Sequence, residues 1–165
     1  MTLDSRIRSA TSADIPEILR VIRDLATYEK APEQAVATDT DLQAVLFPDH
    51  GHPSTFCHIG EIDGKVAGIA LWFLSFSTWT GKQGIWLEDL FVDPQQRGTG
   101  LGKALLASLA QVCVERGLTR LEWCVLNWNT PSIEFYDALG ALPQDDWTTY
   151  RLDGDALAKV GGARA

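Results

Sequence analysis

The chain has 165 residues, the length of one ordinary domain, and 45% of them are hydrophobic, which is enough to bury a core. Its 14 Lys and Arg residues against 22 Asp and Glu residues give a formal net charge of -8, so the broad cationic surface that binds nucleic acid or anionic lipid is not expected. We therefore expect a single domain over residues 1–165, with its core over about 7–152, that binds neither nucleic acid nor membrane.

The cysteines and the apolar runs indicate a reduced, cytoplasmic protein. Cys57, Cys113 and Cys124 are odd in number and lack CxxC spacing, so neither a disulfide framework nor a zinc cage is indicated. The first ten residues lack the apolar segment of a secretory signal, and the longest apolar run, Ile69–Leu74, is too short to span a bilayer.

The first half of the chain predicts two helices and an antiparallel meander. Thr-x-x-Asp boxes at residues 11–14 and 38–41 mark two helix starts, because the Thr and Asp side chains bond each other's backbone amides. Asp63-Gly64 between two strand-like segments is the signal of a tight hairpin. In chain order we expect a strand over 3–8, a helix from Ile15, a short helix ending near Phe47-Pro48, and strands over 56–62 and 66–76.

The second half predicts a strand–helix–strand crossover. A strand over 84–92 leads through a glycine-bearing loop over 97–103 into a helix that ends at Gly117, and strand character returns over 121–125.

The last part of the chain predicts one more helix and one more strand. Thr130 and Pro131 have the chemistry of an N-cap and a first helical residue, and Gly140 is the expected stop. We expect a final strand over 147–152 and a frayed tail over 161–165, so the fold class is a mixed α/β domain.

The glycine loop fits neither common phosphate-binding motif. Ala104 stands where a P-loop has its Ser or Thr, and Gly98, Gly100 and Gly102 form G-x-G-x-G rather than the G-x-G-x-x-G of a dinucleotide site. What remains is a glycine-rich turn that opens a helix, where free amides and the positive end of the dipole can hold a pyrophosphate. The alternative is a tight turn whose glycines only supply positive φ.

Two adjacent carboxylates, Glu88 and Asp89, interrupt the apolar strand over 85–92. In regular pleating they point to opposite faces, so at least one of them lines a cavity or gains a partner, because unpaired burial of a charge is costly or shifts its pKa. The alternative places one of them at a bulge or a strand end, where it is solvated or paired with an arginine.

These segments together resemble the GCN5-related N-acetyltransferase family. The loop fits the family motif Q/R-x-x-G-x-G/A through Arg97, Gly100 and Gly102. The resemblance runs from about Ile7 to Leu152 and is strongest to the diamine (spermidine/spermine) and thialysine acetyltransferase subgroup. The blocks that carry it are Ile7–Thr11, Tyr28-Glu29, Leu87–Val92 and Trp128–Tyr136.

The resemblance implies a mostly antiparallel central sheet flanked by helices, with a splayed strand pair that takes the cofactor. It implies direct transfer of the acetyl group of acetyl-CoA to a primary amine, with Tyr136 as general acid and Glu88 as the base. Tyr28, Glu29, Glu88, Asp89 and Trp79 would bind the amine. The cofactor-binding positions carried over are Leu90, Phe91, Val92, Arg97, Gly98, Thr99, Gly100, Leu101, Gly102, Lys103, Asn129 and Ser132. Family members are commonly dimers, so a homodimer is expected.

Amine acetylation requires a group that removes a proton from the amine. An alkyl ammonium with a pKa of about 10.4 is protonated at neutral pH and must lose a proton before its nitrogen can attack a thioester. His50, His52 and His58 suggest no metal site, because no further ligands cluster with them in the sequence.

We therefore expect an acetyl-CoA-dependent N-acetyltransferase of a small cationic amine: a diamine, a polyamine or a lysine-like amino acid such as thialysine. The alternatives are an enzyme that acetylates protein or peptide amines, and a non-catalytic acyl-CoA-binding sensory module. The presence of Glu88, Asp89 and Tyr136 together argues against the non-catalytic alternative, since a pure binder does not need all three.

Overall fold

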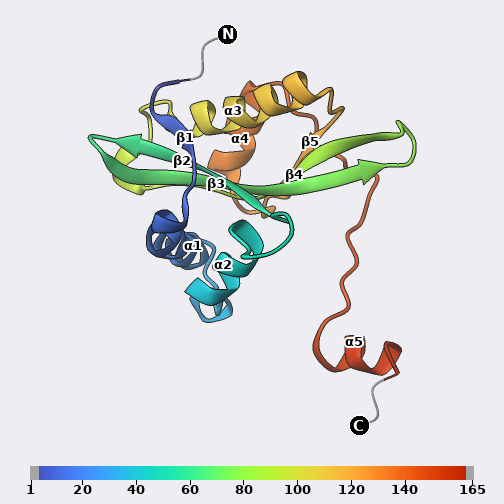
Figure 1. Cartoon of the computed structure of the whole chain (residues 1–165). Helices are drawn as coiled ribbons and strands as arrows, with labels where there is room; N and C mark the ends of the chain where they lie inside the picture. Colours follow the sequence, from blue (N-terminus) through green and yellow to red (C-terminus); the bar gives the residue numbers. More distant parts are fainter. Residues whose placement is uncertain (1–3, 163–165) are drawn as a thin grey trace. The chain divides into compact units, whose positions relative to one another are not determined.

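The first part of the chain is built around a five-stranded sheet with the strand order β1-β2-β3-β4-β5 (Figure 1). The computed structural model describes residues 4–162, in two units that divide between Cys124 and Val125. Neighbouring strands from β1 to β4 are antiparallel, and β5 is parallel to β4, which confirms the mixed, mostly antiparallel fold class. The strands are β1 Ile7–Ser9, β2 Phe56–Ile62, β3 Lys65–Ser77, β4 Lys82–Val92 and β5 Leu121–Glu122.

The predicted hairpin between β2 and β3 is confirmed. Asp63 and Gly64 have φ of 52° and 71°, the left-handed values that a two-residue turn with type I′ geometry requires. This turn sets the register in which Ile62 faces Lys65, and an irregularity between Gly60 and Glu61 then shifts the register by one residue, so that His58 faces Ala70. The long strands β3 and β4 then pair along most of their length.

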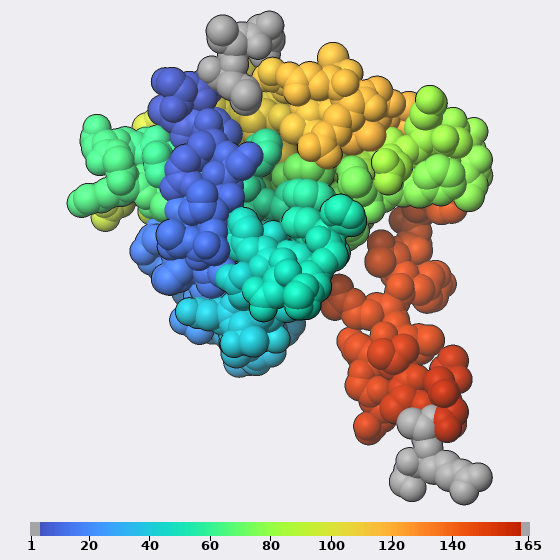
Figure 2. Space-filling view, viewed as in Figure 1, coloured from blue at the N-terminus to red at the C-terminus, as the bar shows by residue number. Residues whose placement is uncertain are grey.

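Helices cover both faces of the sheet. Helices α1 (Ile15–Tyr28) and α2 (Asp39–Leu46) pack on one face, and α3 (Leu101–Arg116) packs on the other (Figure 1). The α1 and α2 surfaces lie side by side below β1 in the space-filling view (Figure 2). Three short 3-10 helices, η1 Ser12–Asp14, η2 Pro32–Gln34 and η3 Pro94–Gln96, complete this unit.

Alternate residues of β2 serve the two faces. Cys57 and Ile59 join the core under α1 and α2, whereas His58 bonds Ser108 of α3. This is the period of two that a strand buried on both faces must have. The sheet therefore presents different chemistry to each helix layer.

The N-terminal strand is tied to α1 by an ionic network. Arg8 donates to both carboxylate oxygens of Asp14 at 2.7 Å and to Glu61 of β2 at 2.7 Å. Asp14 also accepts from the Thr11 amide and hydroxyl at 2.7 and 2.9 Å, which is the expected capping box. The Arg8 guanidinium holds the pKa of Asp14 well below its usual range.

Several sequence predictions need correction. The first strand is Ile7–Ser9 rather than 3–8, and Leu3 and Ala163–Ala165 lie outside the described residues. β5 is Leu121–Glu122 instead of 121–125. The N-cap of α4 (Thr130–Ala138) is Asn129, so Thr130 is already helical.

The predicted last strand over 147–152 is wrong. These residues form no strand, and a short helix, α5 (Gly154–Val160), follows them. A strand needs a neighbour to take its backbone hydrogen bonds, and the described part of the second unit contains no other strand. The large aromatic side chains of this segment are not buried: Trp147 and Tyr150 are 70% and 92% exposed.

No helix within residues 4–162 combines the length and apolar character needed to cross a bilayer.

The Arg8–Asp14 network predicts a pH-dependent stability. Because Asp14 has a lowered pKa in the folded state, its contribution is present above the unfolded pKa of about 3.9 and is lost as the pH falls below it. Asp14→Asn should lower the free energy of unfolding at pH 7 by about 2 kcal/mol, measured by urea unfolding. The difference from wild type should shrink at pH 3. Asp41→Asn, in the exposed capping box of α2, should lower the free energy of unfolding by less than Asp14→Asn does. An equal loss for both variants would contradict the stabilising role of the Arg8–Asp14 ion pair.

Candidate active site

Glu88 is the extra residue of a β-bulge in β4. Leu87 and Asp89, two residues apart on β4, face the consecutive residues Trp72 and Leu71 of β3. An inserted residue interrupts the alternation of side chains and re-aims those beside it. The pair therefore does not follow the regular pleat, and the bulge that was the alternative to it is present.

The bulge turns both carboxylates toward the α1 side of the sheet. Asp89 faces Leu71, which belongs to the core under α1 and α2. Trp86 faces Phe73, two residues from Leu71 and so on the same side. The Trp86 indole donates to the Glu88 carboxylate at 3.0 Å, which brings Glu88 to that side as well.

Three carboxylates share this region. Asp89 is half-buried, and burial raises its pKa to about 6, with further contributions from the negative charges of Glu88 and Glu29. Loss of solvent also raises the pKa of Glu29, which is the C-cap of α1. The C-terminal end of a helix dipole adds negative potential here. We call Glu29, Glu88 and Asp89 the carboxylate cluster; its field favours a cation.

An aromatic pair and an arginine adjoin the cluster. The rings of Tyr28 and Phe91 lie 6.3 Å apart between centroids. The Arg97 guanidinium lies 4.8 Å from the centroid of Tyr28 and 5.5 Å from that of Phe91. Arg97 Nε also donates to the carbonyl of Val92 at 3.3 Å. These contacts fix the start of the glycine loop against β4 and α1.

The glycine loop ends in an open helix N-terminus. Gly100, with φ of 79°, is the N-cap of α3 and supplies no side-chain acceptor. In residues 4–162 no backbone carbonyl accepts from the amides of residues 98–103, which therefore remain available to an anion. Arg6, from before β1, braces the loop by donating to the carbonyl of Thr99 at 3.0 Å.

The edge of β4 beyond Trp86 has no strand beside it. β5 pairs only with Ile85 and Trp86, and within the described chain no strand pairs with Leu87–Val92 on that edge. This is the splayed pair expected for the fold. An extended ligand can hydrogen-bond an open strand edge as an added strand would.

The second unit places three predicted residues on one helix face. Asn129, the N-cap of α4, is followed by Ser132 and Tyr136 at spacings of three and four residues, which align side chains along a helix. Asn129 accepts from the Ser132 amide through its carbonyl at 3.1 Å, and the Tyr136 ring lies 5.3 Å from that of Phe135.

The structure separates Trp79 from the other predicted amine-binding residues of its unit. Trp79 is 81% exposed in the turn between β3 and β4, beside Lys82. Glu88 lies six residues beyond Lys82, which is about 20 Å along a strand. Trp79 is therefore distant from Glu88 along β4, and its assignment to the amine site stays a prediction.

Sequence reasoning missed two contributors to the site. Trp86 was one of six tryptophans without a distinguishing signal, and only its bond to Glu88 reveals its role. Arg6 lies 93 residues from Thr99, so no local pattern connects them. Among residues 4–162 no group of three or more His, Cys, Asp or Glu side chains is arranged to hold a metal ion.

The comparisons with known proteins identify the family of this chain. The open strand edge and the helix N-terminus suit an extended anionic ligand, and the carboxylate cluster suits a cation. The chain belongs to the Acetyltransferase (GNAT) family, whose model matches residues 19–141. It is an acetyl-CoA-dependent N-acetyltransferase that transfers the acetyl group to an amine, which confirms the predicted family and enzyme class.

Curated relatives are similar over nearly the whole chain. Thialysine N-epsilon-acetyltransferase of Bos taurus is 35% identical, with 94% of this chain and 96% of the relative covered. L-ornithine N5-acetyltransferase of Arabidopsis thaliana is 30% identical, with 94% and 87% covered.

Solved structures share the fold. An integron cassette protein from the mobile metagenome of V. cholerae has a TM-score of 0.78 at 24% identity, with 94% of this chain and 96% of that chain covered. An aminoglycoside acetyltransferase from an uncultured soil sample has a TM-score of 0.75 at 18% identity, with 92% and 100% covered.

The raised pKa of Asp89 predicts that its ionised form destabilises the folded protein. Because the carboxyl has a pKa of about 6 when folded and about 3.9 when unfolded, the free energy of unfolding falls as the pH rises from 4 through 6. Asp89→Asn should therefore raise the free energy of unfolding at pH 8 by about 2 kcal/mol and leave it unchanged at pH 4.

Asp146→Asn removes an exposed carboxylate and provides the control for lost charge. Urea unfolding at both pH values measures the effect, and an Asp89→Asn protein no more stable than wild type at pH 8 would contradict the assigned pKa.

Proposed function

We propose that this N-acetyltransferase acts on the primary amine of a small cationic molecule: a diamine, a polyamine or a lysine-like amino acid such as thialysine. The observation that carries the proposal is the carboxylate cluster, which gathers Glu29, Glu88 and Asp89 beside the open edge of β4. The negative potential there suits an ammonium group and disfavours an anionic acceptor. The relatives named for thialysine and ornithine acetylation support the same class of acceptor.

The residues for the donor follow from the open amides and the open strand edge. The amides of Gly98, Thr99, Gly100, Leu101, Gly102 and Lys103 bind the pyrophosphate of acetyl-CoA, and the missing Cβ atoms at the glycines allow close approach. Arg97 supports the loop. The β4 segment Leu90-Phe91-Val92 pairs with the pantetheine arm, and Asn129 and Ser132 contribute from α4. When bound, acetyl-CoA supplies the activated thioester.

The two carboxylates at the bulge have different roles: Asp89 binds the ammonium group and Glu88 removes its proton. Asp89, with Glu29, holds the ammonium group, and Tyr28 lines the site. Glu88 is exposed and oriented by the Trp86 indole, so it can take the amine's proton through a water molecule. The lone pair of the deprotonated amine nitrogen then attacks the carbonyl carbon of the thioester, and the thiolate leaves.

Tyr136 returns a proton to the departing thiolate. A phenol with a pKa of about 10 can act as the acid for a thiol of pKa about 8.5 when its surroundings stabilise the phenolate. Its position on the same face of α4 as Asn129 and Ser132 supports a role beside the donor's binding residues.

The proposed acceptor class is tested by initial rates of free-thiol release from acetyl-CoA. The panel contains diamines, polyamines, lysine, thialysine and a lysine-containing peptide, with and without a metal chelator. We expect saturable release with a small cationic amine and no effect of the chelator. Saturation by the peptide alone, or acetyl-CoA binding without release for any amine, would contradict the proposal.

The division of roles predicts distinct kinetic effects of three substitutions. Glu88→Gln and Tyr136→Phe should each lower kcat by about 10²-fold, with smaller changes in KM. Asp89→Asn should raise the KM of the amine by about tenfold or more at pH 8, because a hydrogen bond to a charged group is lost.

The wild-type KM of the amine should also rise as the pH falls below about 6, where Asp89 becomes protonated, and this rise should be absent in Asp89→Asn. Near-normal kcat in Glu88→Gln or Tyr136→Phe would remove that residue from its assigned role.

A further inference from the structure

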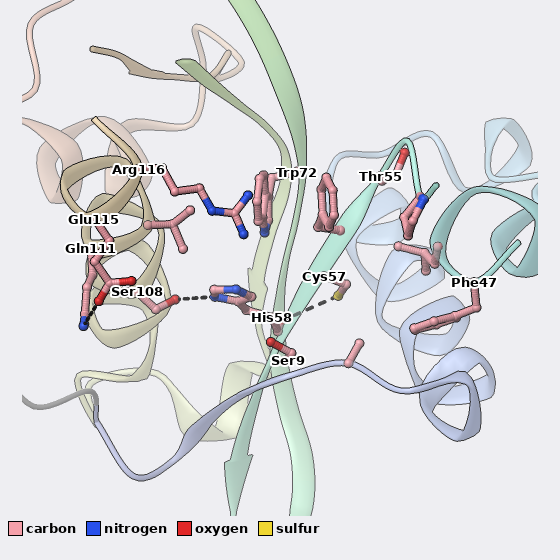
Figure 3. Close-up of a pocket in the computed structure, with 15 residues that line it drawn as sticks. Ser9, Phe47, Thr55, Cys57, His58, Trp72, Ser108, Gln111, Glu115 and Arg116 are labelled. Carbon is pink, nitrogen blue, oxygen red and sulfur yellow. Dashed lines mark hydrogen bonds between the residues drawn. The ribbon is translucent and has the colours of Figure 1, made fainter. Parts of the chain in front are cut away.

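A pocket beside the end of β1 is lined from both faces of the sheet, by residues of α2 on one face and of α3 on the other. It has a volume of about 370 Å³ and is lined by the end of β1, the start of β2, the end of α2 and the last two turns of α3 (Figure 3). Pockets of this size hold small organic molecules. None of the residues assigned to the amine or to acetyl-CoA lines it.

The pocket contains an unsatisfied hydrogen-bond donor. Trp72 is 2% exposed and stacks on Phe56 with ring centroids 4.5 Å apart. Its indole Nε1 is buried and, within the described chain, makes no hydrogen bond. Native proteins rarely leave a buried N–H unpaired, because the lost solvation costs about 1–3 kcal/mol. A ligand that accepts a hydrogen bond here would remove that cost.

A cation stands beside this donor. Figure 3 shows the guanidinium of Arg116, from α3, turned toward the indole nitrogen of Trp72, with the imidazole of His58 below them. Arg116 forms no ion pair with any described residue. An Arg fork and a neighbouring N–H are suited to a carboxylate.

His58 forms a fixed, neutral wall of the pocket. The Ser108 hydroxyl donates to the Leu105 carbonyl at 2.7 Å, so it accepts from Nδ1 of His58, also at 2.7 Å. Burial, and then the charge of Arg116, lowers the pKa of His58. A neutral ring adds no charge to the pocket.

The remaining charge in the pocket limits the ligand to one negative charge. Glu115 also lines the pocket, and its carboxylate accepts from Gln111 at 2.7 Å. One arginine beside one glutamate suits a monoanion better than a phosphate dianion. The apolar lining, which includes Phe47, Phe56 and Val112, suits a hydrocarbon body.

We propose that this pocket binds a small monocarboxylate with an apolar body. Its carboxylate accepts hydrogen bonds from Trp72 Nε1 and the Arg116 guanidinium, and its hydrocarbon part packs beside Phe56. The site does not take the amine substrate, because an ammonium group would face the indole N–H and the guanidinium, which are both donors.

Phenylacetate is the probe, and its neutral isostere phenylacetamide is the matched ligand control. Calorimetric titration of the full chain should give saturable, one-to-one binding of phenylacetate with a Kd of about 1 mM or tighter, and at least tenfold weaker binding of phenylacetamide. Arg116→Gln should weaken phenylacetate binding at least tenfold and leave acetyl transfer unchanged. Trp72→Phe keeps the aromatic ring, removes the donor and should also weaken binding.

Arg23→Gln, on the exposed surface of α1, is the control for loss of a positive charge and should bind normally. If Trp72→Phe does not fold, Arg116→Gln alone decides. The proposal is overturned if wild-type protein shows no saturable binding, if phenylacetamide binds equally well, or if Arg116→Gln binds as tightly as Arg23→Gln. Binding is measured directly, so the result is independent of the identity of the amine substrate.

Discussion

One extra residue in β4 determines where the charged groups of this protein point. Without the bulge at Glu88, strand alternation would send Glu88 and Asp89 to opposite faces of the sheet. With it, Asp89 faces the α1 side, where the charge of Glu29 reaches it, and Glu88 is held by the indole of Trp86. The open edge of β4 begins at the same place, so the donor's binding edge and the carboxylates arise from one local departure from regular structure.

The carboxylate cluster places like charges together in partial burial, and the fold must offset that cost. Burial is the first cause of the raised pKa of Asp89, and the two neighbouring carboxylates add to it. Elsewhere the same unit uses opposite charges: Arg8 joins Asp14 and Glu61, and Arg20 joins Asp24 and Asp93. Ion pairs thus stabilise the scaffold, whereas the like charges of the carboxylate cluster destabilise the site. This contrast is expected where function and stability compete.

The two faces of the sheet carry separate chemistry because side chains alternate along each strand. On β2, Cys57 and Ile59 pack under α1 and α2, while His58 between them bonds Ser108 of α3. On β3, Leu71 faces Asp89, while the adjacent Trp72 lines the pocket beside α3. On β3, adjacent residues thus face the candidate active site and the proposed carboxylate pocket.

Local signals in the sequence determined most of the first unit. The capping boxes at Thr11 and Thr38, the Asp63-Gly64 turn and the glycine before α3 act over a few residues, and each element they predict is present. The family resemblance also followed from short segments in a fixed order, and the family match confirms it. The predicted strand over 147–152 is wrong because the local sequence does not supply a neighbouring strand to pair with.

Only the tertiary structure decided the bulge at Glu88, the bond from Trp86 to Glu88, the Arg6 contact to the glycine loop, and the pocket around Trp72. Each depends on strand register or on residues far apart in the chain. Such contacts arise from the packing of whole elements, which the residues next to each position do not encode.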